Sequence, residues 1–322
     1  MTSRRLFNRI AVAALGALFV SGAAQAQEKT TRIVVPFAAG AVQDTLGRSL
    51  NMELGAALKQ TVIVENKAGA GGTIGTAQVA KATPDGSVLD LAAASHLIAK
   101  YLYGNLSYDP MTSFAPAAYI GNASYILMVP GDLPVNNVAD FIKLVKSSPG
   151  KFNYSSAGNG SATHLSMAYF AALAGLNMEH IPTKSTGEAV TEVLSGRSQA
   201  VIAANVGALG FKDDKRVKLL AVTSPKRSKF IPDLPTVAES GLPGYEFTSW
   251  FGLLAPAGTP VATLDSIQAA MATALKNPAV MERLNKQGIE SEILTNKQFA
   301  DILKQSDVQM ADVVKKSGAK VQ

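Results

Sequence analysis

The segment Val34-Val35-Pro36-Phe37-Ala38-Ala39-Gly40-Ala41-Val42-Gln43-Asp44-Thr45-Leu46-Gly47-Arg48 predicts a buried strand, a tight turn of small residues and the start of a helix. The apolar run before Pro36 is typical of a buried strand, and leucines at helical spacing follow from Leu46 to Leu58. A helix start has unpaired N–H donors and a partial positive charge, so it can bind an anion without a charged side chain. The stretch therefore predicts either an anion-binding turn or, equally, an ordinary α/β connection with Asp44 as a helix-start acid.

The first 26 residues have the pattern of a cleaved export signal. Arg4, Arg5 and Arg9 precede an apolar run over 10–20, and Ala24-Gln25-Ala26 is a small-x-small cleavage sequence. The apolar run is shorter than the ~20 residues of a membrane-spanning helix. We expect cleavage near Ala26/Gln27 and a periplasmic mature protein. The absence of cysteine fits, because a chain of this length can be stabilised by burial without disulfides.

The charge pattern argues against nucleic-acid binding. The formal net charge of +6 falls by half when the three arginines of the leader are removed. The remaining basic residues are dispersed, and those over 212–218 are interrupted by Asp213 and Asp214. We therefore expect no nucleic-acid partner.

Strand and helix patterns alternate along the mature chain. Strands are predicted at about 33–35, 61–65, 87–93, 119–129, 152–155, 179–182, 200–204, 218–223 and 247–254, and helices at about 46–58, 74–82, 138–147, 162–174, 187–194, 261–276, 278–287 and 296–317. This alternation predicts a largely parallel sheet with helices on both faces. The Pro- and Gly-rich segment 225–244 is interpreted as extended surface chain.

A second small-residue turn, Ser156-Ala157-Gly158-Asn159-Gly160-Ser161-Ala162-Thr163-His164, repeats the plan of the first. Ligands of open α/β sheets bind at the carboxyl ends of strands, where both turns fall. We therefore predict a two-lobed α/β fold of the periplasmic-binding-protein type. Domain 1 is expected to comprise 27–122 and 249–322, and domain 2 to comprise 123–248. The chain should cross between lobes near 121–125 and 247–251, and the C-terminal helices should cover the first lobe.

A nucleotide cofactor is not expected. Gly69, Gly71, Gly72 and Gly75 follow a strand, but Ile74 stands where the dinucleotide fingerprint needs its third glycine.

Catalysis and metal binding are also poorly supported. Ser161, His164 and Asp44 could suggest a hydrolase, but no Gly-x-Ser-x-Gly elbow is present. His96, His164 and His180 are the only histidines and lack metal-ligand spacing. We predict no catalytic residue, no metal and no cofactor.

Anion binding needs only the groups that are present. Asn159, Ser161 and Thr163 add neutral donors to the second turn, so one carboxylate could be shared between both turns. Lys184 is either a charged partner or an exposed loop lysine.

Several segments, in this order and spacing, resemble the periplasmic solute receptors of tripartite tricarboxylate transporters, also called Bug receptors, over essentially the whole mature chain. The matching segments are Val35-Pro36-Phe37 with Gly40, Asp44 and Arg48, then Glu65 to Gly72, Tyr108-Asp109-Pro110, Ser156 to Leu165, Ile181-Pro182, Leu234-Pro235-Thr236 and Ser249 to Pro256.

The resemblance implies a two-lobed receptor, expected to be a monomer, that closes on a small carboxylate and delivers it to the membrane permease of a tripartite transporter. The ligand-binding residues predicted on this basis are Phe37, Ala38, Ala39, Gly40, Ala41, Gln43, Asp44, Ser95, His96, Ser156, Gly158, Asn159, Gly160, Ser161, Ala162, Thr163, His164, Thr183, Lys184, Ala203 and Trp250.

The chain departs from the family pattern at three positions. The usual Gly-Gly of the first turn is Gly40-Ala41, the usual Tyr before the lysine is Thr183, and Ala203 replaces a common aspartate. Loss of that acceptor predicts a ligand without a cationic amine, such as a dicarboxylate or an aromatic carboxylate. Two alternatives remain open: a carboxylate-sensing receptor for a membrane signalling partner, and an exported hydrolase.

Overall fold

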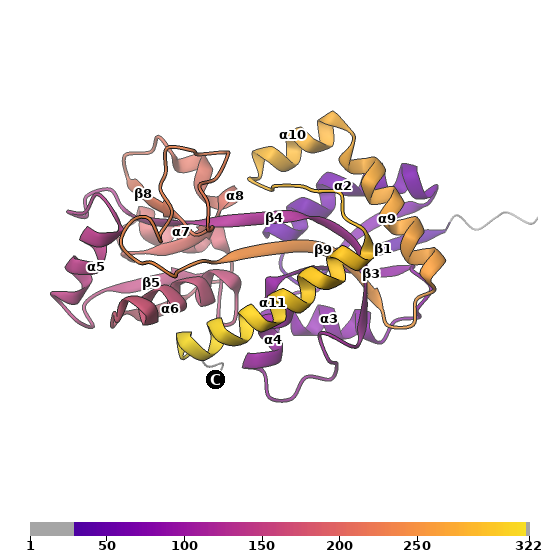
Figure 1. Cartoon of the computed structure of the whole chain (residues 1–322), viewed down its shortest axis with the longest axis horizontal. Coiled ribbons are helices and arrows are strands. Elements are labelled where there is room, and N and C mark those ends of the chain that lie inside the picture. The colour runs from indigo at the N-terminus through magenta and orange to yellow at the C-terminus, as the bar shows by residue number, and fades with distance from the viewer. Residues whose placement is uncertain (1–28, 320–322) are drawn as a thin grey trace, which may run out of the picture.

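Two lobes are joined by two long strands, β4 (Phe114–Pro130) and β9 (Thr248–Pro256), which run side by side through the middle of the molecule (Figure 1). The computed structural model describes residues 29–319, so the predicted export signal lies outside the described residues. β4 and β9 are antiparallel, with pairs from Phe114↔Pro256 to Ser124↔Thr248. The predicted two-lobed α/β fold is confirmed.

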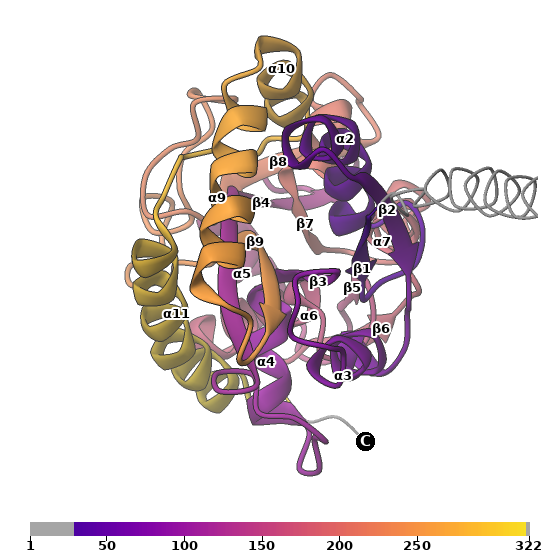
Figure 2. The same cartoon turned by 90° about the vertical axis from the view of Figure 1, so that its right-hand side faces the viewer.

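The first lobe is built on parallel strands β1 (Thr30–Val35), β2 (Thr61–Asn66) and β3 (Val88–Ala93), with β9 next to β3. Helices α2 (Val42–Leu58), α9 (Val261–Leu275) and α10 (Pro278–Lys286) cover one face, and α3 (Thr73–Ala80) and α4 (Ala94–Leu102) cover the other (Figure 2). A short 3₁₀ helix, Ala70–Gly72, precedes α3.

The second lobe contains the parallel pair β5 (Asn153–Ser156) and β6 (Glu179–Pro182), while β7 (Val201–Ala204) and β8 (Val217–Val222) pair with β4. Its helices are α5 (Val138–Lys146), α6 (Ala162–Ala174), α7 (Thr186–Leu194) and the short α8 (Asn205–Ala208), followed by a 3₁₀ turn at Leu209–Phe211.

The prediction of a largely parallel sheet is wrong. The seven-stranded sheet has the order β2-β1-β3-β9-β4-β7, with β8 also on β4, and every pair that includes β4 or β9 is antiparallel. The reason is that β4 and β9 each extend through both lobes and run antiparallel to the strands that they contact there.

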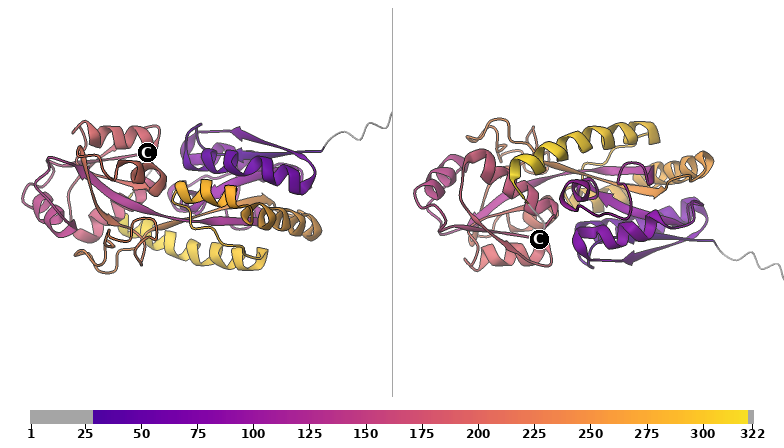
Figure 3. Two further views of the ribbon diagram at one scale, coloured as in Figure 1. Left: turned by 90° about the horizontal axis from the view of Figure 1, so that it is seen from above. Right: turned by 90° about the horizontal axis from the view of Figure 1, so that it is seen from below.

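The long C-terminal helix α11 (Asn296–Ser317) contacts both lobes. It packs against α4 and β4 and also against α6 of the second lobe (Figure 3). Ser306 accepts a hydrogen bond from Trp250 Nε1 at 3.0 Å, and Asp307 pairs with Lys100 at 2.8 Å. The C-terminal helices α9 and α10 cover the first lobe as predicted, and α11 also covers part of it but extends to the second lobe.

The apolar face of α2 anchors the first turn. Leu46, Leu50 and Leu54 are fully buried in one cluster with Phe251 and Met271. Burial of each leucine contributes about 2 kcal/mol, which fixes the start of α2 relative to the sheet.

Residues 225–244 are more than surface chain. Ile231, Val237 and Leu242 are buried. The Val222 N–H of β8 donates to Pro235 O, and the Val237 N–H donates to Val222 O. The apolar residues are too widely spaced for a helix or strand pattern, so the sequence did not reveal this packing.

Candidate functional site

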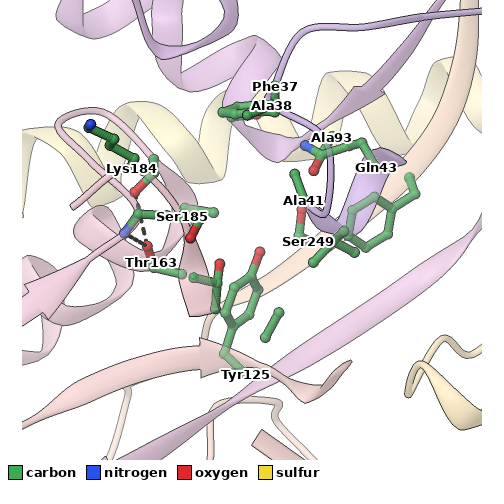
Figure 4. Close-up of a pocket in the computed structure, with 18 residues that line it drawn as sticks. Phe37, Ala38, Ala41, Gln43, Ala93, Tyr125, Thr163, Lys184, Ser185 and Ser249 are labelled. Atoms are coloured by element: carbon green, nitrogen blue, oxygen red, sulfur yellow. Dashed lines mark hydrogen bonds between the residues drawn. The ribbon is translucent and has the colours of Figure 1, made fainter. Parts of the chain in front are cut away.

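A cavity lies between the lobes and encloses about 620 Å³, including the solvent at its mouth (Figure 4). Both small-residue turns contribute to it, as does the base formed by β4 and β9. Its lining consists of Phe37, Ala38, Ala41, Val42, Gln43, Ala93, Ser95, Tyr125, Ala157, Ser161, Ala162, Thr163, Lys184, Ser185, Thr186, Ala204, Ser249 and Phe251.

Four helices of eight or more residues begin at this cavity. The residues that cap or open α2, α4, α6 and α7, among them Ala41, Ala93, Ser161 and Ser185, all lie in the lining. Ala41 and Ala93 provide no side-chain cap, so the first N–H groups of α2 remain available to a ligand. Helix N-termini that converge on a cavity attract an anion through their dipoles and unpaired N–H groups, without a buried cation.

The first cradle is the β1–α2 turn, residues 36–43. Gly40 adopts φ +83° and donates its N–H to Asp44 Oδ2 at 2.9 Å, and Arg48 Nε donates to Asp44 Oδ1 at 2.9 Å. Burial alone would raise the pKa of Asp44, but the hydrogen bonds from Gly40 and Arg48 hold that pKa below its ordinary value. Asp44 thus stays ionised and shapes the turn from behind the cavity.

The second cradle is the β5–α6 turn, residues 156–163. Thr163 Oγ1 accepts the Ala157 N–H at 2.8 Å and lies 2.9 Å from Ser161 Oγ. Ser161 Oγ also caps α6 by accepting the His164 N–H at 3.2 Å. His164 Nδ1 instead accepts the Gly160 N–H at 3.2 Å, so Ser161 and the imidazole of His164 form no nucleophile–base pair.

Two stacked imidazoles support this cradle from behind. The rings of His164 and His180 lie 4.0 Å apart, with Tyr154 stacked on His180 at 5.0 Å. His180 Nε2 is 2.6 Å from Ser156 Oγ. Burial lowers the pKa of His164 to about 4, and burial together with the neighbouring His164 lowers the pKa of His180 to about 3. Both rings are therefore neutral near pH 7.

The structure places nine of the predicted site residues in the cavity lining. These are Phe37, Ala38, Ala41, Gln43, Ser95, Ser161, Ala162, Thr163 and Lys184. A further group lies in the same turns or beside them without lining the cavity: Ala39, Gly40, Asp44, Ser156, Gly158, Asn159, Gly160, His164 and Thr183.

Three predicted residues lie elsewhere, which corrects the sequence-based placement. Ala203 is fully buried in the apolar cluster of β7 with Ile126 and Val190, and its neighbour Ala204 lines the cavity instead. Trp250 points to the opposite side of β9 from the cavity. His96 is buried inside the first lobe on α4, where Nε2 is 2.9 Å from Pro110 O and Nδ1 is 3.4 Å from Asp90 Oδ2.

Three residues on the two crossing strands line the cavity but were not predicted as site residues. Tyr125, Ser249 and Phe251 line the base of the cavity. Strand alternation could have identified two of them. Ser249 and Phe251 share one face of β9, so the choice of Trp250 as a site residue excluded both of its neighbours.

The lining carries little formal charge. Within residues 29–319, no Asp or Glu side chain lines this cavity, and Lys184 is its one basic residue. Figure 4 shows the Lys184 ammonium pointing away from the centre of the cavity. The interior thus offers backbone N–H groups and neutral side chains.

Across the described part of the chain, no group of three or more His, Cys, Asp or Glu side chains is arranged to hold a metal ion. None of the described helices is both long and apolar enough to span a membrane.

Comparison with known proteins gives a consistent family assignment. The model of the tripartite tricarboxylate transporter family receptor matches residues 46–319. The structure of the periplasmic binding protein BugD is 36% identical, with a TM-score of 0.83 over 91% of this chain and 99% of its own. Rpa4515 of R. palustris, solved with adipate, is 29% identical, with a TM-score of 0.84 over 91% of this chain and 98% of its own. MatC from Rhodopseudomonas palustris, solved with bound malate, is 30% identical, with a TM-score of 0.82 over 88% of this chain and 98% of its own.

Members of this family are substrate-binding receptors, which rules out the exported hydrolase considered from the sequence. The chain belongs to the tripartite tricarboxylate transporter receptor family, and it is a solute-binding receptor of the Bug type, not an enzyme.

Proposed function

We propose that this receptor captures a small organic carboxylate between its lobes in the periplasm and delivers it to the membrane permease subunits of a tripartite transporter. The observation that carries this proposal is the convergence of four helix N-termini on one cavity without an acidic side chain. Two relatives of similar fold were solved with adipate and with malate, which supports a carboxylate as the ligand class.

The lining favours a dicarboxylate or an aromatic carboxylate. Six alanines and the rings of Phe37, Tyr125 and Phe251 leave room for an apolar or aromatic ligand body. A ligand ammonium group would find no carboxylate acceptor in this cavity, so amino acids are disfavoured. Ala203 lies outside the cavity, so the aspartate that is missing at this position does not bear on the ligand.

We propose the domain boundaries expected from the sequence, with 27–122 and 249–322 in one lobe and 123–248 in the other, and a monomeric receptor. Light scattering coupled to size exclusion tests the monomer: a mass near 31 kDa for the mature chain is expected by roughly proportional scaling from the 33.5 kDa precursor, and twice that mass would contradict it.

Ligand class is tested by a thermal-shift screen followed by titration calorimetry of the mature protein with malate, adipate, benzoate and an amino acid. A ligand that binds only the native state stabilises it by about 2.7 kcal/mol at one hundred times Kd. Stabilisation by carboxylates and not by the amino acid is expected; the reverse ranking would contradict the proposed ligand class.

The cradle is tested with Thr163→Val, which removes the acceptor of the Ala157 N–H. We expect roughly tenfold weaker carboxylate binding, because a hydrogen bond that orders a charged site contributes about 1.5 kcal/mol. Thr191→Val is the matched control, since the Thr191 hydroxyl donates to Gly187 O on the exposed face of α7. Equal carboxylate affinities of Thr163→Val and Thr191→Val would argue against a role of the second cradle in ligand binding.

Delivery is tested in proteoliposomes that contain the permease subunits. Uptake of labelled carboxylate that depends on this receptor supports transport. Ligand binding without stimulated uptake would favour a sensory role.

A further inference from the structure

Tyr125 stands at the base of the cavity, on the strand that joins the two lobes. It is only 4% exposed, and its hydroxyl points into the space enclosed by Gln43 and Ser249 on one side and Thr163 and Ser185 on the other (Figure 4). The hydroxyl therefore lies in the space that a ligand held between the two cradles would occupy.

The position of Tyr125 is fixed by its surroundings. It pairs with Ala204 across β4 and β7, and its N–H donates to Thr223 Oγ1 at 2.8 Å. Its ring meets Phe247 edge to face at 5.4 Å. Turning the ring out of the cavity would break this aromatic contact in a fully buried cluster, so the side chain is a preorganised wall.

The polar groups at the bottom of the cavity are uncharged. Burial raises the pKa of Tyr125 to about 12, so the phenol keeps its proton at any ordinary pH. Ser249, beside it, uses its oxygen to accept the Ala94 N–H at 3.2 Å. Gln43 adds an amide from the first lobe. The Tyr125 hydroxyl and the Gln43 amide can each donate to an acceptor oxygen of a ligand, whereas an apolar ligand end would gain no such hydrogen bond.

We propose that Tyr125 is a specificity-determining residue, whose hydroxyl donates to an acceptor oxygen at the end of the ligand opposite the cradle-bound carboxylate and whose ring limits ligand length. The favoured ligands are then short carboxylates with a second carboxylate at the far end, and monocarboxylates of equal length bind less well. This inference rests on the proposed function, because it presupposes a carboxylate in the cavity.

The test compares the mature wild-type receptor with Tyr125→Phe by titration calorimetry, using dicarboxylates from malonate to adipate and the monocarboxylate that matches each in length. Tyr125→Phe keeps the ring and its packing, and its unliganded melting temperature reports whether the fold is intact. Tyr169→Phe is the control, since Tyr169 is also a buried tyrosine but lies on α6 outside the cavity.

We expect wild type and Tyr169→Phe to prefer the dicarboxylate. In Tyr125→Phe this preference should fall by about tenfold or more, because a hydrogen bond to a charged group is lost, while monocarboxylate affinity stays within about twofold. Equal weakening of both ligand types, unchanged discrimination, or a wild-type preference for monocarboxylates would each overturn the inference while leaving carboxylate binding in place. Failure of wild type to bind any carboxylate would instead overturn the proposed function.

Discussion

At the scale of single residues, the site depends on neutral side chains that hold backbone amides in place. Thr163 and Ser161 organise the second turn from inside the cavity, and His164 and His180 do so from behind. His164 Nδ1 can accept the Gly160 N–H only while its ring is neutral, so protonation of His164 would remove this hydrogen bond.

The stacked histidines make stability depend on pH. Their native pKa values, about 4 and about 3, lie below the ordinary 6.5, so the unfolded chain binds protons that the native chain does not as the pH falls through this range. The unfolding free energy should therefore drop by about 1 kcal/mol per histidine for each pH unit below 6.5. Urea unfolding at pH 7.0, 6.0 and 5.0 measures this slope.

The double variant His164→Asn with His180→Asn serves as the control for that slope. It should be less stable than wild type at pH 7 and vary less between pH 7 and 5. Parallel pH profiles for both proteins would show that these histidines do not carry the effect.

At the scale of elements, helix starts are the functional parts of the fold. α2 has 17 residues and begins at Ala41, whose extended backbone conformation suits a capping residue but whose side chain cannot cap. The usual stabilising choice of Ser, Asp or Asn is missing where the helix faces the cavity. The start of α2 is therefore less stable without a side-chain cap, and a bound ligand would accept hydrogen bonds from its unpaired N–H groups.

Substitution at Ala41 tests whether the missing cap lowers stability and favours ligand binding. Ala41→Asn and Ala41→Asp should each stabilise the free protein by about 1 kcal/mol, since either side chain caps the first N–H groups. Both should weaken carboxylate binding, and Ala41→Asp more strongly because it adds a like charge beside the ligand. Chemical denaturation and calorimetry give the two quantities. A variant that gains stability without losing affinity would contradict a role for this helix start.

β9 and α11 pack closely against each other at Gly252. A Cβ at Gly252 would lie 2.3 Å from Phe299 Cζ and 2.9 Å from Ala118 O. Gly252→Ala should therefore cost about 1 to 3 kcal/mol in unfolding free energy through overpacking. Gly104→Ala, where no atom lies within 4 Å of the added carbon, is the comparison. Equal midpoints in urea would mean that α11 shifts without cost.

In the whole molecule, the lobes also touch where the second small-residue turn meets the end of α4. Gly160 of the second lobe approaches Leu102 and Tyr103 at the end of α4 in the first lobe, and a Cβ there would lie 3.3 Å from Leu102 Cδ1. On the far side, α11 spans both lobes. The cavity is therefore enclosed by parts that belong to different lobes.

Gly160→Ala should weaken ligand binding, because the added methyl group obstructs this contact and strains φ +77°. Gly175→Ala carries the same kind of strain at φ +63° with open space around it, so it should lower stability without changing Kd. Calorimetric Kd values and small-angle scattering with and without ligand check both expectations. Equal Kd values in the two variants would argue that closure does not involve Gly160.

Features of the fold with a local cause could be predicted from the sequence. Leucines from Leu46 to Leu58 indicated α2, and the small residues around Gly40 and Gly160 indicated two open turns after strands. These features follow from spacing and side-chain size, which a linear pattern contains. They were enough to predict a two-lobed fold and the two turns that meet at one cavity.

Which faces of β4, β7 and β9 meet the cavity depends on the tertiary packing. Ala204, Tyr125, Ser249 and Phe251 line it, whereas Ala203 and Trp250 point elsewhere. A strand exposes alternate residues to opposite faces, so a shift of one position reverses the assignment. Both faces of β4 and β9 are buried and similarly apolar, and only the packing of two lobes and α11 around them determines which face the ligand would meet.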